Sequence, residues 1–407
     1  MRIILTALLL SLIITALVNA QPQTDFLISF WCGPSPTADN YKSIAEANFN
    51  VAGPVCGETS VSFNKQLLDQ CKQNGLKALI KDDRILAAKP DDPDFEKNLN
   101  AVIADYSQHP ALYGYYLADE PSAAEFPRLA AVKQYLLKKD PQHIPYINLF
   151  PNYASAAQLG TASYEEYLRQ YLDIVKPAVV SYDHYALTPT GEREVWWENL
   201  EIIRKESLAT GKPFAVIILA TPHGPYRDPD EGDFRWQVYS AAAYGAKGIL
   251  YFTYITPAPG SEWNYRSGIV SVAGEKTAKY DQVKQINAEL KTIGKILTGL
   301  KSTAVYHFGK LPAGTIAAPQ NSLVISKDED LLAGEFADKT GARYVLVVNR
   351  RAKEAREIIF SIRKAKKLVE MTKDGKNRVV GELEYGYDIP VRARFLSGEG
   401  KLFKIIE

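Results

Sequence analysis

Short apolar runs alternate along the chain with segments in which apolar residues recur at helical spacing, from Gln21 to about Leu300 of 407 residues. The short runs are rich in β-branched and aromatic residues and are bounded by turn formers, which predicts buried strands. The expected strands span residues 26–30, 50–55, 76–80, 112–118, 145–150, 178–182, 214–220 and 248–254. The amphipathic segments predict helices over residues 38–48, 63–74, 94–107, 127–139, 164–175, 192–210, 233–244 and 277–300.

Eight strands and eight helices in strict alternation predict parallel strands joined by helical crossovers. Eight such units match a closed (β/α)8 barrel, which typically needs ~250 residues. Gly75 and Gly211 stand where helices should end before the third and seventh strands. An open, doubly wound sheet is the alternative, but residues 32–36 are not the glycine-rich loop that such sheets carry after their first strand. We therefore expect a TIM barrel over residues 21–300.

The pattern changes after about residue 300, where helical spacing gives way to short alternating runs. Strands are expected over residues 323–325, 344–349 and 357–362, and turns at Asp374-Gly375 and at residues 397–400. Residues 301–407 are therefore predicted to form a small antiparallel β-sandwich domain.

Residues 1–20 have the pattern of a secretory signal peptide. One charge, Arg2, precedes an apolar run over residues 3–18, and a cleavage-like sequence ends at Ala20. A membrane anchor is the alternative, although the run is at the short end of spanning lengths. We expect a secreted or periplasmic protein with no membrane attachment after cleavage.

The charges are balanced, with 48 Lys and Arg against 47 Asp and Glu. A neutral chain without a basic or acidic tail argues against nucleic acid and anionic membranes as partners. Three cysteines are present, and Cys32 and Cys56 follow neighbouring predicted strands. A disulfide between them suits an exported protein, and buried free thiols are the alternative, as for Cys71.

Chemistry in such barrels takes place on the loops that follow the strands. The polar and aromatic residues expected there, and taken as candidate catalytic or substrate-binding residues, are Trp31, Asp82, Asp119, Glu120, Asn148, Tyr182, Asp183, Tyr185, His223, Tyr254, Glu262 and Trp263. The sequence has no glycine-rich phosphate loop, no HExxH motif and no GxSxG motif. A metal site that joins His184 and His223 to an acid is an alternative, but we expect no metal and no cofactor.

Hydrolysis of a glycosidic bond fits these residues best, because it needs one carboxylic acid, a second carboxylate and aromatic faces for sugar rings. Glu120 is the candidate acid, since apolar, Tyr-rich surroundings with Asp119 beside it should raise its pKa. Asp119 is expected on the opposite side of the strand end. The structural alternative is that Asp119 caps a helix and Glu120 forms an ion pair. Candidate sugar platforms are Trp31, Tyr182, Tyr185, Trp263 and Tyr265.

The strand ending Asp119-Glu120-Pro121 resembles the Asn-Glu-Pro of the clan A glycoside hydrolases, which include family 42-like β-galactosidases and family 5-like enzymes. Residues 234–252 are similar to the seventh helix and eighth strand of bacterial exported glycosidase-like barrels, and residues 396–403 to the end of their C-terminal β-domain. The resemblance implies that Glu120 is the acid/base. Asp119 replaces an Asn that would contact the sugar.

The sequence departs from that family at the seventh strand. Clan A nucleophiles are a Glu at its end, whereas this strand ends Leu219-Ala220-Thr221 without an acid, and Asp230 is expected to begin the next helix. Asp183 is the best substitute, and Asp82 and Glu262 are alternatives. The hypothesis is an exported glycoside hydrolase that acts on an oligo- or polysaccharide. The alternative is a non-catalytic carbohydrate-binding barrel that lost its nucleophile.

Overall fold

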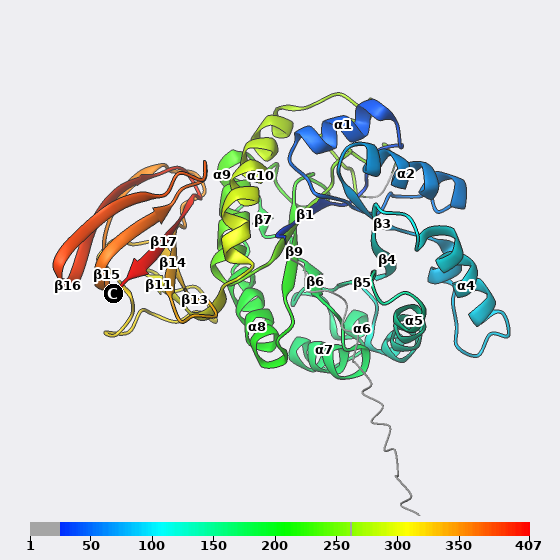
Figure 1. The fold of residues 1–407 in the computed structure, drawn as a ribbon, viewed down its shortest axis with the longest axis horizontal. Helices are drawn as coiled ribbons and strands as arrows, with labels where there is room; N and C mark the ends of the chain where they lie inside the picture. Colours follow the sequence, from blue (N-terminus) through cyan, green and yellow to red (C-terminus); the bar gives the residue numbers. More distant parts are fainter. Residues whose placement is uncertain (1–24, 261–262) are drawn as a thin grey trace, which may run out of the picture.

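Eight parallel strands form a ring that is surrounded by helices (Figure 1). The computed structural model describes residues 25–260 and 263–407. Neighbouring strands follow the order β1-β10-β9-β6-β5-β4-β3-β2. Their bounds are β1 (Leu27–Phe30), β2 (Val51–Ala52), β3 (Lys77–Ile80), β4 (Leu112–Asp119), β5 (Ile144–Leu149), β6 (Val180–Asp183), β9 (Phe214–Leu219) and β10 (Gly248–Phe252). The predicted TIM-barrel architecture is confirmed.

The ring closes between β1 and β2 through Asn50. Its backbone N–H donates to the Ile28 carbonyl oxygen over 3.0 Å, and its side-chain oxygen accepts from the Ile28 N–H over 2.8 Å. The Asn50 amide nitrogen also donates to the Phe26 carbonyl oxygen over 2.8 Å. A Cβ on Gly53 would lie 1.5 Å from the Phe30 carbonyl oxygen, so only glycine allows the strands to approach this closely.

Eight longer helices surround the strands, close to the predicted positions. They are α1 (Ala38–Glu46), α2 (Val61–Gln73), α4 (Phe95–Tyr106), α5 (Phe126–Lys139), α7 (Tyr164–Gln170), α8 (Val195–Thr210), α9 (Glu231–Ala243) and α10 (Ala278–Leu297). Shorter helical turns are α3 (Asp83–Leu86), η1 (Ala123–Glu125), α6 (Ala156–Leu159) and η2 (Tyr171–Val175).

The expected helix over residues 192–210 begins later than predicted. A hairpin of β7 (Leu187–Thr188) and β8 (Gly191–Glu192) occupies its start, and Gly191 adopts the positive φ of 135° that the turn requires. Asp230 begins α9 as expected, since its side chain accepts a hydrogen bond from the Asp233 N–H in a capping box.

Side chains alternate between two apolar layers along the barrel strands. One layer fills the barrel interior and includes Trp31, Tyr116 and Tyr146. The other lies between the strands and the helices and includes Phe30 and Tyr182. A residue's position along the strand therefore decides whether it can reach the barrel mouth.

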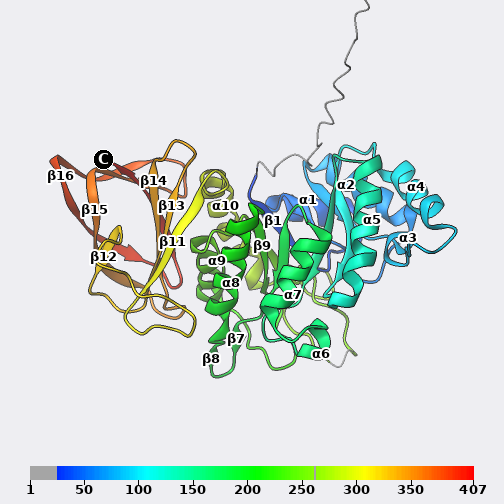
Figure 2. The ribbon, with the colours of Figure 1, turned by 90° about the horizontal axis from the view of Figure 1, so that it is seen from below.

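A second, antiparallel sheet follows α10 and lies beside the barrel (Figure 2). Its strands run in the order β11-β13-β14-β17-β15-β12, and β16 pairs with β15. Their bounds are β11 (Lys301–Phe308), β12 (Val324–Ser326), β13 (Leu331–Ala337), β14 (Arg343–Asn349), β15 (Arg356–Met371), β16 (Arg378–Phe395) and β17 (Gly400–Ile406).

The two faces of this sheet have different partners. Val345 and Val347 of β14 belong to a separate core within the C-terminal region. Leu346 and Val348, which point the other way, belong to the barrel's core. Helix α9 lies between barrel and sheet, and every residue from Gly232 to Ala243 is buried. A helix covered on both sides buries its polar side chains as well, and in α9 the buried Arg235 pairs with Glu289 at 2.7 Å.

Candidate active site

Three carboxyl groups meet at the carboxyl ends of β4, β5 and β6. In the sheet register Asp119 lies opposite Asn148, and Asn148 lies opposite Ser181. The Asn148 amide nitrogen donates to a carboxylate oxygen of Asp119 over 3.0 Å and to one of Asp183 over 3.2 Å. One amide thus holds two acids from different strands, and Glu120 completes the cluster.

Glu120 reaches this cluster because of its backbone. The register of β4 shifts between Tyr116 and Ala118, where a bulge inserts an extra residue. Glu120 follows with a φ of 45°, which is uncommon outside glycine, and its N–H donates to the Asn148 carbonyl oxygen over 2.9 Å. Asp119 was expected on the opposite side of the strand end. The bulge and the left-handed residue instead bring both acids to one cluster.

The carboxyl groups of Glu120 and Asp183 lie close enough to change each other's pKa, both through their charges and through the hydrogen bond that forms when one of them is protonated. Burial raises the pKa of Glu120 to about 7, and the charge of Asp119 adds to that rise, whereas the hydrogen bond with Asp183 opposes it. Burial first, and then the charges of Glu120 and Asp119, raise the pKa of Asp183 well above its ordinary value. The cluster therefore holds a proton near neutral pH, which general acid catalysis requires.

Asp119 is the solvent-exposed member of the carboxyl cluster. Its side chain is exposed, although surrounding atoms raise its pKa by burial. Hydrogen bonds from Asn148 and Trp31 and the charge of Lys81 oppose that rise. A carboxyl group at the bottom of a cleft is expected to be both reached by solvent and surrounded by many protein atoms.

Trp31 lies beneath the carboxyl cluster in the barrel interior. Its ring packs against Tyr116 at 5.4 Å and Tyr146 at 6.3 Å between centroids. The Tyr146 hydroxyl group in turn forms a 2.5 Å hydrogen bond with the Ser181 hydroxyl group. Trp31 is buried and donates a hydrogen bond to Asp119, so in this structure it orients an acid from below.

An aromatic cluster forms one wall of the barrel mouth. Tyr185 and His223 lie 5.2 Å apart, and His223 and Trp263 lie 6.1 Å apart between ring centroids. The same cluster includes Tyr226, Phe252 and Tyr265. Tyr185 also feels the charges of Asp183 and Glu120, which places it beside the acids. Trp263 is 48% exposed, so its ring is accessible at the rim.

Other predicted site residues lie away from this cluster. Tyr182 and Tyr254 are buried in the layer between strands and helices, because the side chains next to them along the strands point inward. Asp82 is buried in an ion pair with Arg84, at 2.7 Å, and accepts a 2.8 Å hydrogen bond from Tyr106. Its observed partners are structural. Glu262 lies outside the described residues.

The seventh barrel strand ends without an acid in the structure as in the sequence. Thr221, which follows β9, is buried and hydrogen bonded to the Thr253 hydroxyl group over 2.8 Å. His184 bonds Asn199 over 3.0 Å and packs on Trp196, so it does not meet His223. Among residues 25–260 and 263–407, no group of three or more His, Cys, Asp or Glu is arranged to hold a metal ion.

Several residues near the acids were not predicted as site residues from the sequence. Tyr116, Tyr146 and Lys81 were read as strand or loop residues, yet Tyr116 feels all three carboxyl charges and Lys81 affects Asp119. The side that Tyr116 faces could not be predicted, because the bulge changes the side that each β4 residue faces. The alternation of β5 was a usable signal for Tyr146, because it lies two residues before Asn148.

The loops after β1 and β2 are joined by a disulfide between Cys32 and Cys56, whose Cα atoms are 4.7 Å apart. Cys71 is a buried free thiol. In the described part of the chain, helices are too short or too polar to cross a bilayer.

Comparisons with known proteins point to glycosidases. A family model described as Beta-galactosidase, Glyco_hydro_42, matches residues 137–293. The matched segment includes Asp183, but it begins after Glu120. No curated protein sequence matches the chain.

The solved structures that are similar to this chain include several beta-galactosidases. The enzyme from Bacillus circulans sp. alkalophilus gives a TM-score of 0.65 at 9% identity and covers 96% of this chain and 100% of that one. A catalytic mutant of Gan42B, a GH42 beta-galactosidase from G. stearothermophilus, gives 0.63 at 9%, with 95% and 100% covered. The enzyme from the psychrophilic Marinomonas ef1 gives 0.50 at 11%, and the alignment spans 67% of this chain and 62% of that protein.

At these identities the superpositions show the fold alone. Taken with the family match, they confirm the predicted resemblance to clan A-like (β/α)8 glycoside hydrolases. The class defined by fold and family match is that of the glycosidases, as predicted.

Proposed function

We propose that this protein is an exported glycoside hydrolase that cleaves O-glycosidic bonds in an oligo- or polysaccharide, with Glu120 as general acid. The observation that carries the proposal is the cluster of Glu120, Asp183 and Asp119 at the carboxyl ends of the barrel strands, in which Asn148 bonds two of the acids and Glu120 and Asp183 affect each other's pKa. Active sites of such barrels lie at this end. A carboxyl group with a pKa of about 7 can donate a proton at neutral pH.

In this proposal Glu120 protonates the oxygen of the leaving sugar, and Asp183 shares the proton before the substrate binds. A retaining enzyme holds its acid and its nucleophile ~5–5.5 Å apart, and an inverting enzyme separates its two carboxyl groups further, by ~6.5–9.5 Å. The mutual effect of the two groups on their pKa values fits a proton-sharing role for Asp183 in the free enzyme. A second role as base or nucleophile would require the pair to separate around a bound sugar.

The aromatic cluster supports a carbohydrate substrate. Tyr185 lies beside the acids, and the exposed ring of Trp263 lies at the rim, so a chain of sugars can stack along the wall that they form. Asp119 and Asn148 present polar atoms to sugar hydroxyl groups. β-Galactosides are the first substrates to test, because the matched family model is described as Beta-galactosidase.

A non-catalytic carbohydrate-binding barrel is the second candidate. It is favoured by the end of β9, where Thr221 is hydrogen bonded within the protein and an acid is lacking. A protein of this kind would bind the glycan through the same aromatic wall without turnover.

Hydrolysis of a glycan panel by wild type, Glu120→Gln and Asp183→Asn separates the two candidates. We expect wild-type turnover and a loss in kcat of about 10²–10⁴ in Glu120→Gln on natural linkages, the usual contribution of a general acid. The loss should be smaller on aryl glycosides, whose leaving group needs less protonation. Glu165→Gln, an exposed acid on α7, is the matched control. Binding without turnover by wild type would favour the second candidate, and full activity of Glu120→Gln would remove Glu120 from the mechanism.

We further propose export with removal of residues 1–20. The disulfide between Cys32 and Cys56 supports this, because such bonds persist in oxidising compartments. The intact mass of protein recovered from the periplasm or medium should correspond to a chain that starts at Gln21. Recovery of the full-length chain from the cytoplasm alone would contradict export.

A further inference from the structure

A large cavity lies at the opposite end of the barrel from the acids. It has a volume of about 1010 Å³. Its lining includes the first residues of three strands, Leu112 of β4, Ile144 of β5 and Phe214 of β9. Glu120 and Asp183 follow or end their strands at the other end, so this cavity is a separate feature from the candidate active site.

Positive charge dominates this cavity. Its lining contains six lysines and Arg204, and no Asp or Glu. Some of these charges have partners nearby, since Arg204 pairs with Glu201 at 2.7 Å and Lys247 donates to the Leu300 carbonyl oxygen over 2.6 Å. In a chain with almost equal numbers of acids and bases, seven positive side chains without a negative one in the lining is a marked separation of charge.

Two neighbouring lysines of the lining act on Lys133 with their charges. Burial lowers the pKa of Lys133, and the charges of Lys212 and Lys176 lower it further. Within residues 25–260 and 263–407, none of these three side chains forms an ion pair or a side-chain hydrogen bond. Like charges held together without a counter-charge are unfavourable, and a bound anion would remove that repulsion.

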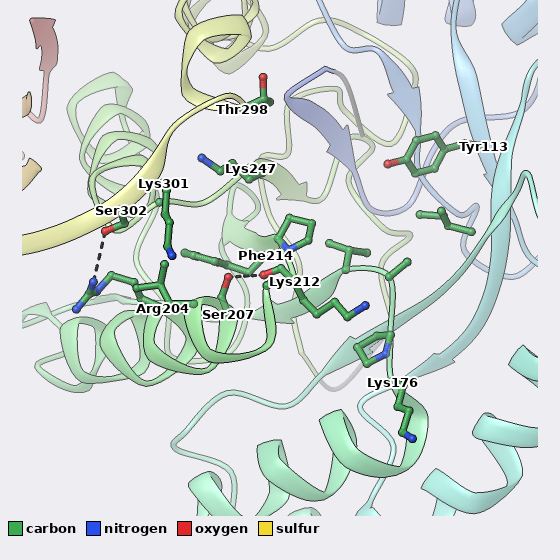
Figure 3. A pocket seen from close by; sticks show the side chains of 18 of the residues that line it. Tyr113, Lys176, Arg204, Ser207, Lys212, Phe214, Lys247, Thr298, Lys301 and Ser302 are labelled. Carbon is green, nitrogen blue, oxygen red and sulfur yellow. Dashed lines mark hydrogen bonds between the residues drawn. The ribbon is translucent and has the colours of Figure 1, made fainter. Parts of the chain in front are cut away.

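The lysines come from separate elements and surround a partly apolar floor (Figure 3). Lys176 precedes β6, Lys212 precedes β9 and Lys301 begins β11. Phe214 lies among them, and Tyr113 of β4 lines the cavity at the right of the view. A lining that combines ammonium groups with aromatic and aliphatic side chains suits a ligand with several negative groups on a compact ring or chain.

We infer that this cavity binds a small organic polyanion, with two or more phosphate, sulfate or carboxylate groups on a compact body. Its volume is at the upper end of the ~300–1,000 Å³ of small-molecule sites, which favours a discrete ligand over a flat membrane surface. Lysines act as point charges for such groups.

The test measures binding of fructose 1,6-bisphosphate and digalacturonate by isothermal titration calorimetry, with fructose as neutral control. The two acids distinguish phosphate from carboxylate ligands. We expect at least one to bind wild type, with affinity falling as salt rises. The triple variant Lys133→Gln, Lys176→Gln, Lys212→Gln should lose at least about tenfold in affinity, since one charge-assisted hydrogen bond is worth that much.

A second triple variant, Lys42→Gln, Lys89→Gln, Lys284→Gln, removes the same charge from exposed positions outside the cavity lining and should bind like wild type. Thermal melts without ligand, and glycosidase activity, verify that both variants are folded. Absence of binding of either acid to wild type would overturn the inference. Equal losses in the two triple variants would also overturn it, because the effect would then be one of net charge. Neither result bears on Glu120, so the proposed function is tested separately.

Discussion

The position of Glu120 depends on features of single residues. The bulge in β4 and the left-handed backbone at Glu120 together place its side chain beside Asp183. A positive φ at a residue other than glycine is unfavourable and persists only where the surroundings hold it. Here the hydrogen bond from the Glu120 N–H to the Asn148 carbonyl oxygen contributes to that restraint. The acid is therefore fixed by the backbone and by its hydrogen-bonded partner.

Asp119 should tune the acidity of Glu120. Its charge is the second cause of the raised pKa of Glu120, after burial. A general acid works only while protonated, so activity should fall as pH rises through a pKa of about 7. Asp119→Asn removes the charge, keeps an acceptor for the Asn148 amide and restores Asn-Glu-Pro. We expect the basic limb of the pH profile of kcat/KM to move to lower pH.

The control for this measurement is Asp91→Asn, an exposed acid outside the carboxyl cluster. A weaker interaction with substrate would lower kcat/KM at every pH and leave the limb in place. A basic limb that stays at the wild-type pH, or that moves to higher pH, would show that Asp119 does not act on Glu120 in this way.

Much of the site could be predicted from residue types, and the errors have a physical cause. Acids at the ends of strands 4 and 6 could be placed together because parallel strands end at the same edge. The side that each residue faces could not be predicted reliably, because the bulge reverses the alternation within β4. Tyr182 illustrates the regular alternation of side chains along β6. Since Asp183 points inward, its neighbour Tyr182 points to the helices.

At the scale of elements, the barrel depends on how β1 and β2 meet. The alternating pattern predicted all eight strands, but it could not show that β2 has only two residues or that a side chain takes part in closing the ring. Such contacts join residues that the hydrophobic pattern does not relate. Asn50 was predicted as the first residue of a strand, and the structure gives it a hydrogen-bonding role.

Asn50→Ala should destabilise the barrel. The change leaves the Ile28 N–H, which is fully buried, and the Phe26 carbonyl oxygen without their side-chain partner. Each unsatisfied buried group costs about 1–3 kcal/mol, so for the two groups we expect a loss on the order of 2–6 kcal/mol in the free energy of unfolding. Urea unfolding measures it. Asn98→Ala on α4 is the control and should change stability by less than about 0.5 kcal/mol. Equal stability of the two variants would exclude this role for Asn50.

At the scale of the whole molecule, the C-terminal sheet is packed tightly against the barrel. Helix α9 is buried by both, and glycines allow the close contact. A Cβ on Gly334 of β13 would lie 2.2 Å from the Ala243 carbonyl oxygen, and one on Gly232 would lie 2.0 Å from the Ala352 carbonyl oxygen. The change of pattern near residue 300 indicated a separate sheet, but single-chain spacing does not show which helix it covers.

Gly334→Ala should therefore weaken barrel and sheet together. The added methyl group forces the backbone of β13 away from α9, and overpacking of this kind costs about 1–3 kcal/mol. All five Trp residues lie in the barrel sequence, so Trp fluorescence reports the barrel, and far-UV circular dichroism reports both parts. In wild type the two signals should change at one urea concentration, and in Gly334→Ala both should shift to lower urea. Gly299→Ala, whose Cβ would meet its nearest neighbour at an ordinary 3.5 Å, should leave the midpoint unchanged. A wild-type barrel signal that unfolds separately from the sheet would show that the two parts are not coupled through α9.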